Sequence, residues 1–268
     1  ESDPAFAAEA LTLPGPGYIA EQLDEVDPEA ILHVRTALRK FIAANLDAKL
    51  RDAYGRFKVV GEYSPDPVSS GRRALRNLCL GYLMELTSQP IIAQCVEQLD
   101  NADNMTEAMA ALSSLANCDC PERDPALKKF YEQWRDEPLV VDKWFTVQAT
   151  SRLPNTLACV KDLMHHEAFD LKNPNKVRAV IGAFCHGNHA GFNAGDGSGY
   201  AFAADQVVAL DAINAQIAAR LARAFDRWRK FDQLHQQYAR AALDRIKITE
   251  GLSKDTFEVV SNALAEIG

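Results

Sequence analysis

The sequence predicts an all-α protein, an irregular α-solenoid of stacked antiparallel helix pairs. Apolar residues recur at helical spacing through most of the 268 residues. Short connectors rich in Pro, Gly, Asn or Asp join helical segments that are mostly 10–14 residues long, which suits paired antiparallel helices. Strand-type alternation is nearly absent, and KVVGEYS at 58–64 is the only short candidate for a strand. No strict repeat, linker or low-complexity segment divides the chain, so we expect one helical-repeat domain over residues 1–268.

The first long helix is predicted in DPEAILHVRTALRKFIAANLDAKL. Asp27 is a suitable N-cap, and Pro28 suits the first helical turn. Five apolar residues then recur at helical spacing and make one apolar stripe, the pattern of a helix that packs by one face: Ile31, Val34, Leu38, Phe41 and Ile42.

Further helices follow in order, and their spacing suits an armadillo- or HEAT-like superhelix. Asn104-Met-Thr-Glu107 resembles a capping box ahead of an apolar run. The helix predicted at 213–246 should be broken near Asp226. The predicted segments are about 70–86, 90–99, 105–117, 125–136, 140–150, 155–166, 174–185, 200–211, 213–246 and 254–267.

Composition and charge limit the classes of function. Hydrophobic residues make up 47% and charged residues 25%, as in ordinary globular domains. The formal charge of -8 argues against nucleic acid or an anionic membrane as a partner. No apolar run approaches the roughly 20 residues that span a bilayer, and no signal peptide is visible. The six cysteines are sparse and several lie in apolar helical runs, which indicates a reducing, cytoplasmic compartment.

HHEAFD at 165–170 shares two residues with a zinc-protease motif. That motif needs His-Glu-x-x-His, because two histidines four residues apart can bind one metal. Asp170 stands four residues after His166, where the helix should already be ending. We therefore interpret His166 as a helix-end residue favoured by the helix dipole.

A second candidate is CHGNH, which contains Cys185, His186 and His189. A closed zinc site needs four ligands, and no fourth is evident nearby. Cys118-Asp-Cys120 is distant in sequence, and its spacing is not C-x-x-C. A polar loop is the better interpretation, and the role of the cluster stays open. We expect no metal site and no catalytic residue in this chain.

The glycine-rich stretch GDGSGY at 195–200 is interpreted as a tight turn. A phosphate-binding loop would need a preceding strand and a Gly-Lys-Ser/Thr end, and neither is present. The turn should need a positive φ, with Asp196 or Ser198 capping the next helix.

Two arginine-bearing segments stand out. In NPNKVRAVIGAF, Asn173 should cap a helix whose buried stripe contains Val177, Val180, Ile181 and Phe184, and Arg178 lies at the edge of that stripe. In AARLARAFDRWRK, Arg220, Arg223 and Arg227 follow i, i+3, i+7 spacing on one basic face. The plainer interpretation of this face is a solvated one paired with Asp226 and other acids.

Several stretches resemble a known family. They carry the elements NMTEAMAAL, DKWF, NPN-x-x-R and DGSGY in the same order and cover nearly the whole chain. On these elements the sequence resembles the C-terminal helical domain of bacterial aminopeptidase N. The stretches are AEALTLPG, NADNMTEAMAALSSLANCDCPERDPALKKFYEQWRDEPLVVDKWFTVQATS, NPNKVRAVIGAF and DGSGYAF.

The resemblance implies a non-catalytic part of a larger zinc aminopeptidase, which removes N-terminal residues from peptides. In that family the zinc and the His-Glu-x-x-His motif belong to a separate catalytic domain, and the helical domain closes the active-site chamber. The chain would lack the first helices of that domain and be inactive alone, with no cofactor of its own. Its partners would be the catalytic domain of the same polypeptide and the peptide substrate.

By motif match, the resemblance places two chamber-facing arginines at Arg178 and Arg220, where they would contact the downstream part of the peptide. The match is looser at Arg220, and the CHGNH loop departs from the family's pattern. The alternative is a free-standing helical-repeat module that binds a partner protein. An upstream reading frame that contains His-Glu-x-x-His would decide between the two.

Overall fold

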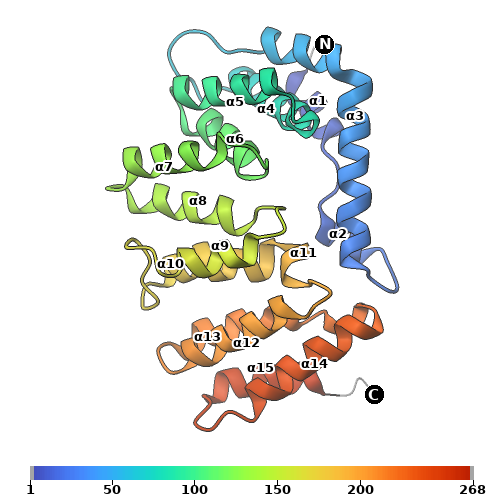
Figure 1. Cartoon of the computed structure of the whole chain (residues 1–268), viewed down its shortest axis with the longest axis vertical. Coiled ribbons are helices and arrows are strands. Elements are labelled where there is room, and N and C mark those ends of the chain that lie inside the picture. The colour runs from blue at the N-terminus through green and yellow to red at the C-terminus, as the bar shows by residue number, and fades with distance from the viewer. Residues whose placement is uncertain (1–2, 266–268) are drawn as a thin grey trace. The chain divides into compact units, whose positions relative to one another are not determined.

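The structure is a computed structural model that describes residues 3–265, and its regular elements are helices (Figure 1). Within those residues the one β feature is an isolated parallel bridge between Val26 and Phe231. The all-α prediction is confirmed. The candidate strand at 58–64 does not form, and these residues are irregular.

The helices run in chain order as follows, with 3₁₀ turns and one π-helix labelled η: α1 (Pro4–Leu11), α2 (Pro16–Glu21), α3 (Pro28–Arg56), α4 (Pro67–Leu83), η1 (Met84–Leu86), α5 (Gln89–Asn101), α6 (Met105–Ala116), α7 (Arg123–Trp134), α8 (Pro138–Ala149), α9 (Thr156–Leu163), α10 (Pro174–Val177), η2 (Arg178–Gly187), α11 (His189–Phe192), α12 (Ser198–Asp211), α13 (Ala215–Ala222), η3 (Arg223–Phe225), η4 (Trp228–Lys230), α14 (Gln233–Lys247) and α15 (Lys254–Leu264).

Two compact units divide the chain. Unit 1 contains residues 1–15 and 33–133, and unit 2 contains residues 16–32 and 134–268. Within unit 1, α4 packs on α1 and α6, and α5 packs on α6. Its core is a cluster of aliphatic, tyrosine and cysteine side chains that includes Leu80, Leu83, Ile91 and Leu115. The prediction of a single domain stays a prediction.

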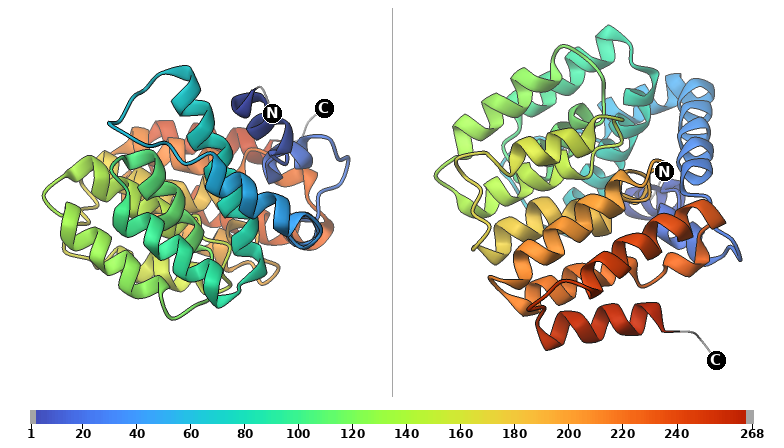
Figure 2. Two further views of the ribbon diagram at one scale, coloured as in Figure 1. Left: turned by 90° about the horizontal axis from the view of Figure 1, so that it is seen from above. Right: turned by 60° about the horizontal axis from the view of Figure 1, so that its bottom comes forward.

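Unit 2 is a succession of helices packed on their neighbours (Figures 1 and 2). The π-helix η2 contacts α8, α9 and α12, whereas α12 also contacts α13 and α14. Both α13 and α14 then pack on α15. The segment 16–32 belongs to this unit because Val26 N donates to the Lys230 carbonyl at 2.8 Å and Val26 packs with Phe231.

Several predicted helix boundaries hold for identifiable reasons. Asp27 caps α3 by accepting a hydrogen bond from Ala30 N at 2.9 Å. Asn104 caps α6 by accepting one from Glu107 N at 3.0 Å, which confirms half of the capping box. The break near Asp226 is confirmed, because α13 ends at Ala222 and two 3₁₀ turns precede α14. The predicted last helix forms as α15, and positions 266–267 lie outside the described residues.

The predicted stripe on α3 is wrong for three of its five residues. Ile31 is buried and Ile42 is half-buried, but Val34, Leu38 and Phe41 are 61%, 42% and 64% exposed. At 100° per residue these three lie on the side of α3 opposite Ala43, Leu50 and Tyr54, which form its packed face. Arg39, one turn before Ala43 in the sequence, also lies toward the packed side. Its Nε and Nη2 donate to Glu85 and to the Gly81 carbonyl.

The helix predicted at 174–185 forms in a different geometry. After one α-helical turn in α10, residues Arg178–Gly187 adopt a π-helix, whose hydrogen bonds span five residues. The predicted stripe is nevertheless buried, with Val177 at 2% exposure and Val180, Ile181 and Phe184 at 0%. π-Helical segments are rare in proteins, and those that occur are often found at functional sites. This segment is therefore the first place to examine for a site.

Candidate functional site

Arg178 is the first residue of the π-helix, and its side chain is exposed. The helix start is prepared by Asn173, whose Oδ1 accepts from Asn175 N at 3.0 Å, and by Pro174. A Cβ added at Gly182 would lie 3.7 Å from Arg178 Cγ, so the aliphatic stem lies along the helix over this glycine. The Arg178 Nη1 donates to Asn175 Oδ1 at 3.1 Å. The stem is therefore packed while the charged head faces solvent.

Asn175 is a partner that the sequence reasoning missed. It stands three residues before Arg178, and this spacing brings side chains onto one helix face. The bond to Asn175 orients the guanidinium but leaves its charge uncompensated, because an amide oxygen is neutral.

Arg220 is exposed on α13 between the buried residues Ala219 and Leu221. Its helix is capped by Asn214, whose Oδ1 accepts from Ile217 N at 3.2 Å. Among residues 3–265, the Arg220 side chain makes no hydrogen bond or ion pair. The helices of Arg178 and Arg220 both pack on α12, but no bond within the described residues joins the two guanidinium groups.

Several other arginines of unit 2, unlike Arg178 and Arg220, have carboxylate partners among the described residues. Arg223 lies 3.8 Å from Asp226, and Arg227 lies 2.6 Å from Glu21. The plainer interpretation of the predicted basic face is therefore correct for these two residues. Two more arginines, on α14, are paired in the same way: Arg240 with Asp244 at 3.8 Å and Arg245 with Asp205 at 3.0 Å.

The glycine-rich segment before α12 is a tight turn, as predicted. Gly197 has a φ of 72°, and a Cβ there would lie 2.6 Å from the Tyr238 ring. A Cβ on Gly199 would lie 2.2 Å from the Phe192 carbonyl oxygen, so α12 begins against the end of α11. Asp196 Oδ1 accepts from Ser198 N at 2.9 Å, and hydrogen bonds from Ser198 lower the pKa of Asp196.

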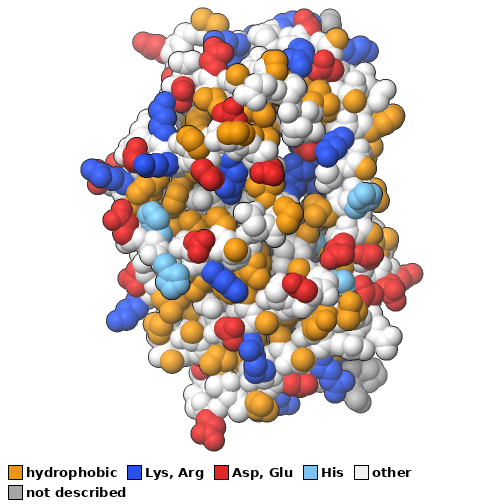
Figure 3. Space-filling model, in the orientation of Figure 1, with side chains coloured by type: hydrophobic (Ala, Val, Ile, Leu, Met, Phe, Trp, Pro, Cys, Tyr) orange, Lys and Arg blue, Asp and Glu red, His pale blue; other side chains and the backbone are white. Residues whose placement is uncertain are grey.

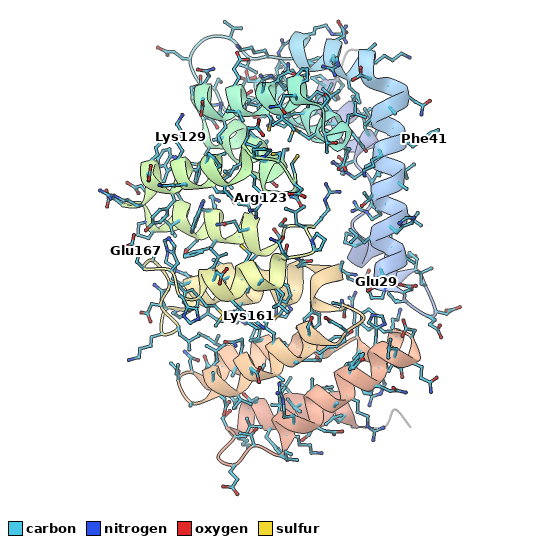
Figure 4. The ribbon with its side chains drawn as sticks, viewed as in Figure 1. Glu29, Phe41, Arg123, Lys129, Lys161 and Glu167 are labelled. Carbon is cyan, nitrogen blue, oxygen red and sulfur yellow. The ribbon has the colours of Figure 1, made fainter. Side chains whose placement is uncertain are left out.

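Contacts from distant parts of unit 2 hold this turn in place. Gly195 N donates to Glu29 Oε1 at 3.2 Å, and Glu29 is marked in Figure 4. The carbonyl oxygen of Asn193 lies 2.9 Å from His235 Nε2, while its side-chain oxygen accepts from Tyr200 OH at 2.8 Å. The turn after the π-helix is thus held at several points. It leads directly into α12, which contacts both of the arginine-bearing helices, η2 and α13.

The Cys185, His186 and His189 cluster borders a cavity of about 300 Å³ together with Asp226 and other residues of unit 2. Cys185 is buried, and desolvation lowers the pKa of both histidines, with Asp226 opposing the shift at His186. Within residues 3–265, no group of three or more His, Cys, Asp or Glu side chains is placed to hold a metal ion.

His166 lies in the turn after α9 rather than in the helix. Its ring centroid is 5.1 Å from that of Trp144, and its Nδ1 accepts a hydrogen bond from Ala168 N at 3.1 Å. Burial lowers its pKa, which disfavours the charged form. The interpretation of His166 as a cation at a helix end is therefore replaced by that of a neutral, packed ring.

Comparison with known proteins places the chain in a family of helical-repeat domains. Residues 1–265 match the family described as "Domain of unknown function (DUF3458_C) ARM repeats", and the chain belongs to this family. Because ARM repeats are stacked helices, the match confirms the predicted α-solenoid.

The chain is similar to several aminopeptidases. The chain is 40% identical over 263 residues to Aminopeptidase N of Escherichia coli and 37% identical over 263 residues to that of Caulobacter vibrioides. Each match covers 98% of this chain and 30% of the relative, so the chain spans about a third of their length. The structure of Legionella pneumophila aminopeptidase A in complex with aspartic acid is similar with a TM-score of 0.89 and 31% identity, over 98% of this chain and 32% of that one.

These matches confirm the resemblance to the C-terminal domain of an aminopeptidase N-like protein. No helix among residues 3–265 is both long and apolar enough to cross a lipid bilayer.

Proposed function

We propose that this chain is the non-catalytic C-terminal domain of a zinc-dependent aminopeptidase that removes N-terminal residues from peptides. In this proposal it closes the active-site chamber, and Arg178 and Arg220 contact the downstream part of the bound peptide. The zinc belongs to the catalytic domain of the same polypeptide, where it would polarise the scissile carbonyl group. This chain contributes peptide contacts and the exclusion of water.

The observation that carries the proposal is that Arg178 and Arg220 have no carboxylate partner within the described residues, unlike Arg223, Arg227 and Arg245. A short peptide brings a C-terminal carboxylate and a row of carbonyl oxygens. A guanidinium can bind a carboxylate through two parallel hydrogen bonds. An arginine without an internal carboxylate keeps this capacity for a ligand.

Two further observations support the choice of partners and compartment. The formal charge is -8, and Lys, Arg, Asp and Glu side chains are interspersed on the face shown in Figure 3, which disfavours nucleic acid as a ligand. All six cysteines are free thiols, which supports a cytoplasmic location.

Kinetics of the full-length enzyme with Arg178→Ala test this function. The substitution should lower kcat/KM for tri- and tetrapeptides about ten- to a hundredfold, the value of a hydrogen bond to a charged group. Aminoacyl chromogenic amides lack a downstream carboxylate and should be affected much less. Arg240→Ala is the matched control, because this exposed arginine has its own carboxylate partner, Asp244. An equal loss on both substrate types at unchanged thermal stability would contradict the proposal.

A further inference from the structure

We propose that Cys118 and Cys120 form a reversible intramolecular disulfide, which makes the loop between α6 and α7 a thiol-oxidation site. This inference is independent of the proposed aminopeptidase function. It depends on a local arrangement in unit 1 that neither the family match nor the arginines explain.

The loop brings the two thiols together. The backbone bends at both cysteines, and the exposed residues Asp119 and Pro121 place the loop at the surface. Cys118 belongs to the core cluster of unit 1 and Cys120 packs against it, and the two lie close enough that Cys120 raises the pKa of Cys118. Two cysteines separated by one residue at a bend can meet the Cα separation of about 4.4–6.8 Å that a disulfide needs.

Arg123 holds both ends of this loop. Its backbone N donates to the Cys120 carbonyl at 3.2 Å, and its Nε donates to the Ala116 carbonyl at 3.3 Å. Cys118 N in turn donates to the Leu115 carbonyl at 2.9 Å. Figure 4 marks Arg123 at the start of α7. The two cysteines are thus held near one another before any bond forms, which lowers the entropy lost when the ring closes.

The order of the two steps follows from the exposure of the two thiols. Burial, together with Cys120, raises the pKa of Cys118, so Cys118 stays protonated while Cys120 reacts. Cys118 is 4% exposed, whereas Cys120 is only partly buried, so an oxidant reaches Cys120 first.

The oxidant is a small-molecule disulfide. The Cys120 thiolate attacks one of its sulfur atoms, the S–S bond of the oxidant breaks, and one thiolate leaves with the electron pair. Cys118 then loses its proton and attacks Cys120 Sγ, which expels the second thiolate. The two protein thiols are oxidised by two electrons, the oxidant is reduced to two thiols, and the two released protons neutralise the leaving thiolates.

The charges beside the thiols predict which disulfide reacts fastest. Asp119 and Glu122 both oppose ionisation of Cys118 and give the loop a negative charge. Cystamine, which is cationic, should therefore react several-fold faster than the anionic glutathione disulfide, and added salt should narrow the difference. Glu122→Gln should reduce the preference for cystamine.

The test treats the native 268-residue chain with cystamine or glutathione disulfide, then traps free thiols with N-ethylmaleimide and maps peptides by tandem mass spectrometry. We expect a peptide that contains Cys118 and Cys120 with neither cysteine alkylated and a mass about 2 Da lower than that of the reduced peptide. Dithiothreitol should restore the mass and the alkylation of both cysteines. Cys118→Ser should instead leave a stable mixed disulfide on Cys120. Cys159→Ser is the control, because it removes another partly buried thiol and should leave the Cys118–Cys120 bond unchanged.

Three results would overturn the proposal. The first is a mixed disulfide that persists on Cys120 although Cys118 is present. The second is a bond from either cysteine to Cys95, whose buried thiol is close enough to feel both electrostatically. The third is no reaction of the native chain under conditions in which the chain unfolded in urea is oxidised at these two cysteines.

Discussion

His235 Nδ1 lies 2.6 Å from Asp232 Oδ2, and the other ring nitrogen of His235 lies 2.9 Å from the carbonyl oxygen of Asn193. Both partners can only accept hydrogen bonds when Asp232 is ionised, so a ring with two N–H groups satisfies both. His235 is 4% exposed and sits in the first turn of α14. The pair therefore ties the start of α14 to the beginning of the glycine-rich turn.

Asp232→Asn should isolate the charge of this pair, because asparagine is also a good N-cap and can keep the bonds from Leu234 N and His235 N. We expect a loss of about 1–2 kcal/mol in the free energy of unfolding at pH 7, since about a third of the Asp232 side chain is exposed. Urea denaturation of both proteins measures it.

The difference should depend on pH in one direction. Burial raises the pKa of Asp232, but hydrogen bonds from His235 and the charge of its ring outweigh burial, and the net pKa is lowered. A carboxylate with a lowered folded-state pKa stabilises the protein above its unfolded pKa of about 3.9 and loses this contribution as the pH falls through the folded value. The gap between wild type and Asp232→Asn should close in acid. A gap of the same size at neutral and acidic pH would exclude this role of the charge.

Gly199→Ala should be strongly destabilising. Its Cβ would lie 2.2 Å from the Phe192 carbonyl oxygen and 2.6 Å from that of Gly191, so the backbone of the turn must move. We expect a cost of about 3 kcal/mol or more, as for other severe steric strain in a packed segment. Gly55→Ala is the control, since nothing lies within 4 Å of its Cβ in α3 and alanine should stabilise this helix by about 0.5–1 kcal/mol. Thermal denaturation compares the two, and a similar Tm for both variants would contradict the steric argument.

Glu107→Ala should destabilise unit 1 because it leaves a buried guanidinium without its carboxylate. Arg76 Nη1 lies 2.5 Å from Glu107 Oε1, and its Nη2 donates to Tyr54 OH at 3.0 Å. Both charged side chains are largely buried, at 7% and 13% exposure, so removing one should cost about 3–5 kcal/mol. The double variant Arg76→Met with Glu107→Leu should lose less than the sum of the single changes, measured by urea denaturation. Additive losses would show that the two side chains act independently.

The sequence predicts best those helices in which a capping residue comes directly before a regular apolar stripe. The segment from Asn173 shows this, since Asn173 and Pro174 mark its start and Val177, Val180 and Phe184 are buried as expected. Its conversion to a π-helix could not be predicted, because the apolar residues of this segment follow the α-helical period. The packing of η2 against α8, α9 and α12 is not visible in the sequence either.

The missed elements have different causes. α1 spans eight residues and α2 six, which is too short for a clear apolar period. On α3, the residues Val34, Leu38 and Phe41 have helical spacing but face away from the packed side. Periodicity shows that apolar residues share a face of a helix; it does not show that another element covers that face. The arginines of the candidate site are a similar case, since sequence alone did not show which of them have carboxylate partners.

The two candidate arginines should act together on the same peptide in the full-length enzyme. Arg220→Ala should lower kcat/KM for tripeptides, as is expected for Arg178→Ala, because both guanidinium groups have uncompensated charge and their helices both pack on α12. Suppose that one of the two arginines binds the C-terminal carboxylate of the peptide. Amidating the peptide's C-terminus should then lower kcat/KM of the wild-type enzyme as much as substituting that arginine does. The variant that lacks this arginine should cleave the free and the amidated peptide with the same kcat/KM. The other arginine would bind carbonyl oxygens, so its substitution should still lower kcat/KM for the amidated peptide.

The double variant should show a coupling of about 0.5–3 kcal/mol if both arginines contact one peptide. Arg240→Ala should leave kcat/KM unchanged for both peptides, since Arg240 lies 3.8 Å from Asp244 on α14 and the proposal gives it no peptide contact. Equal effects of amidation on wild type and on both single variants would mean that neither arginine reads the carboxylate.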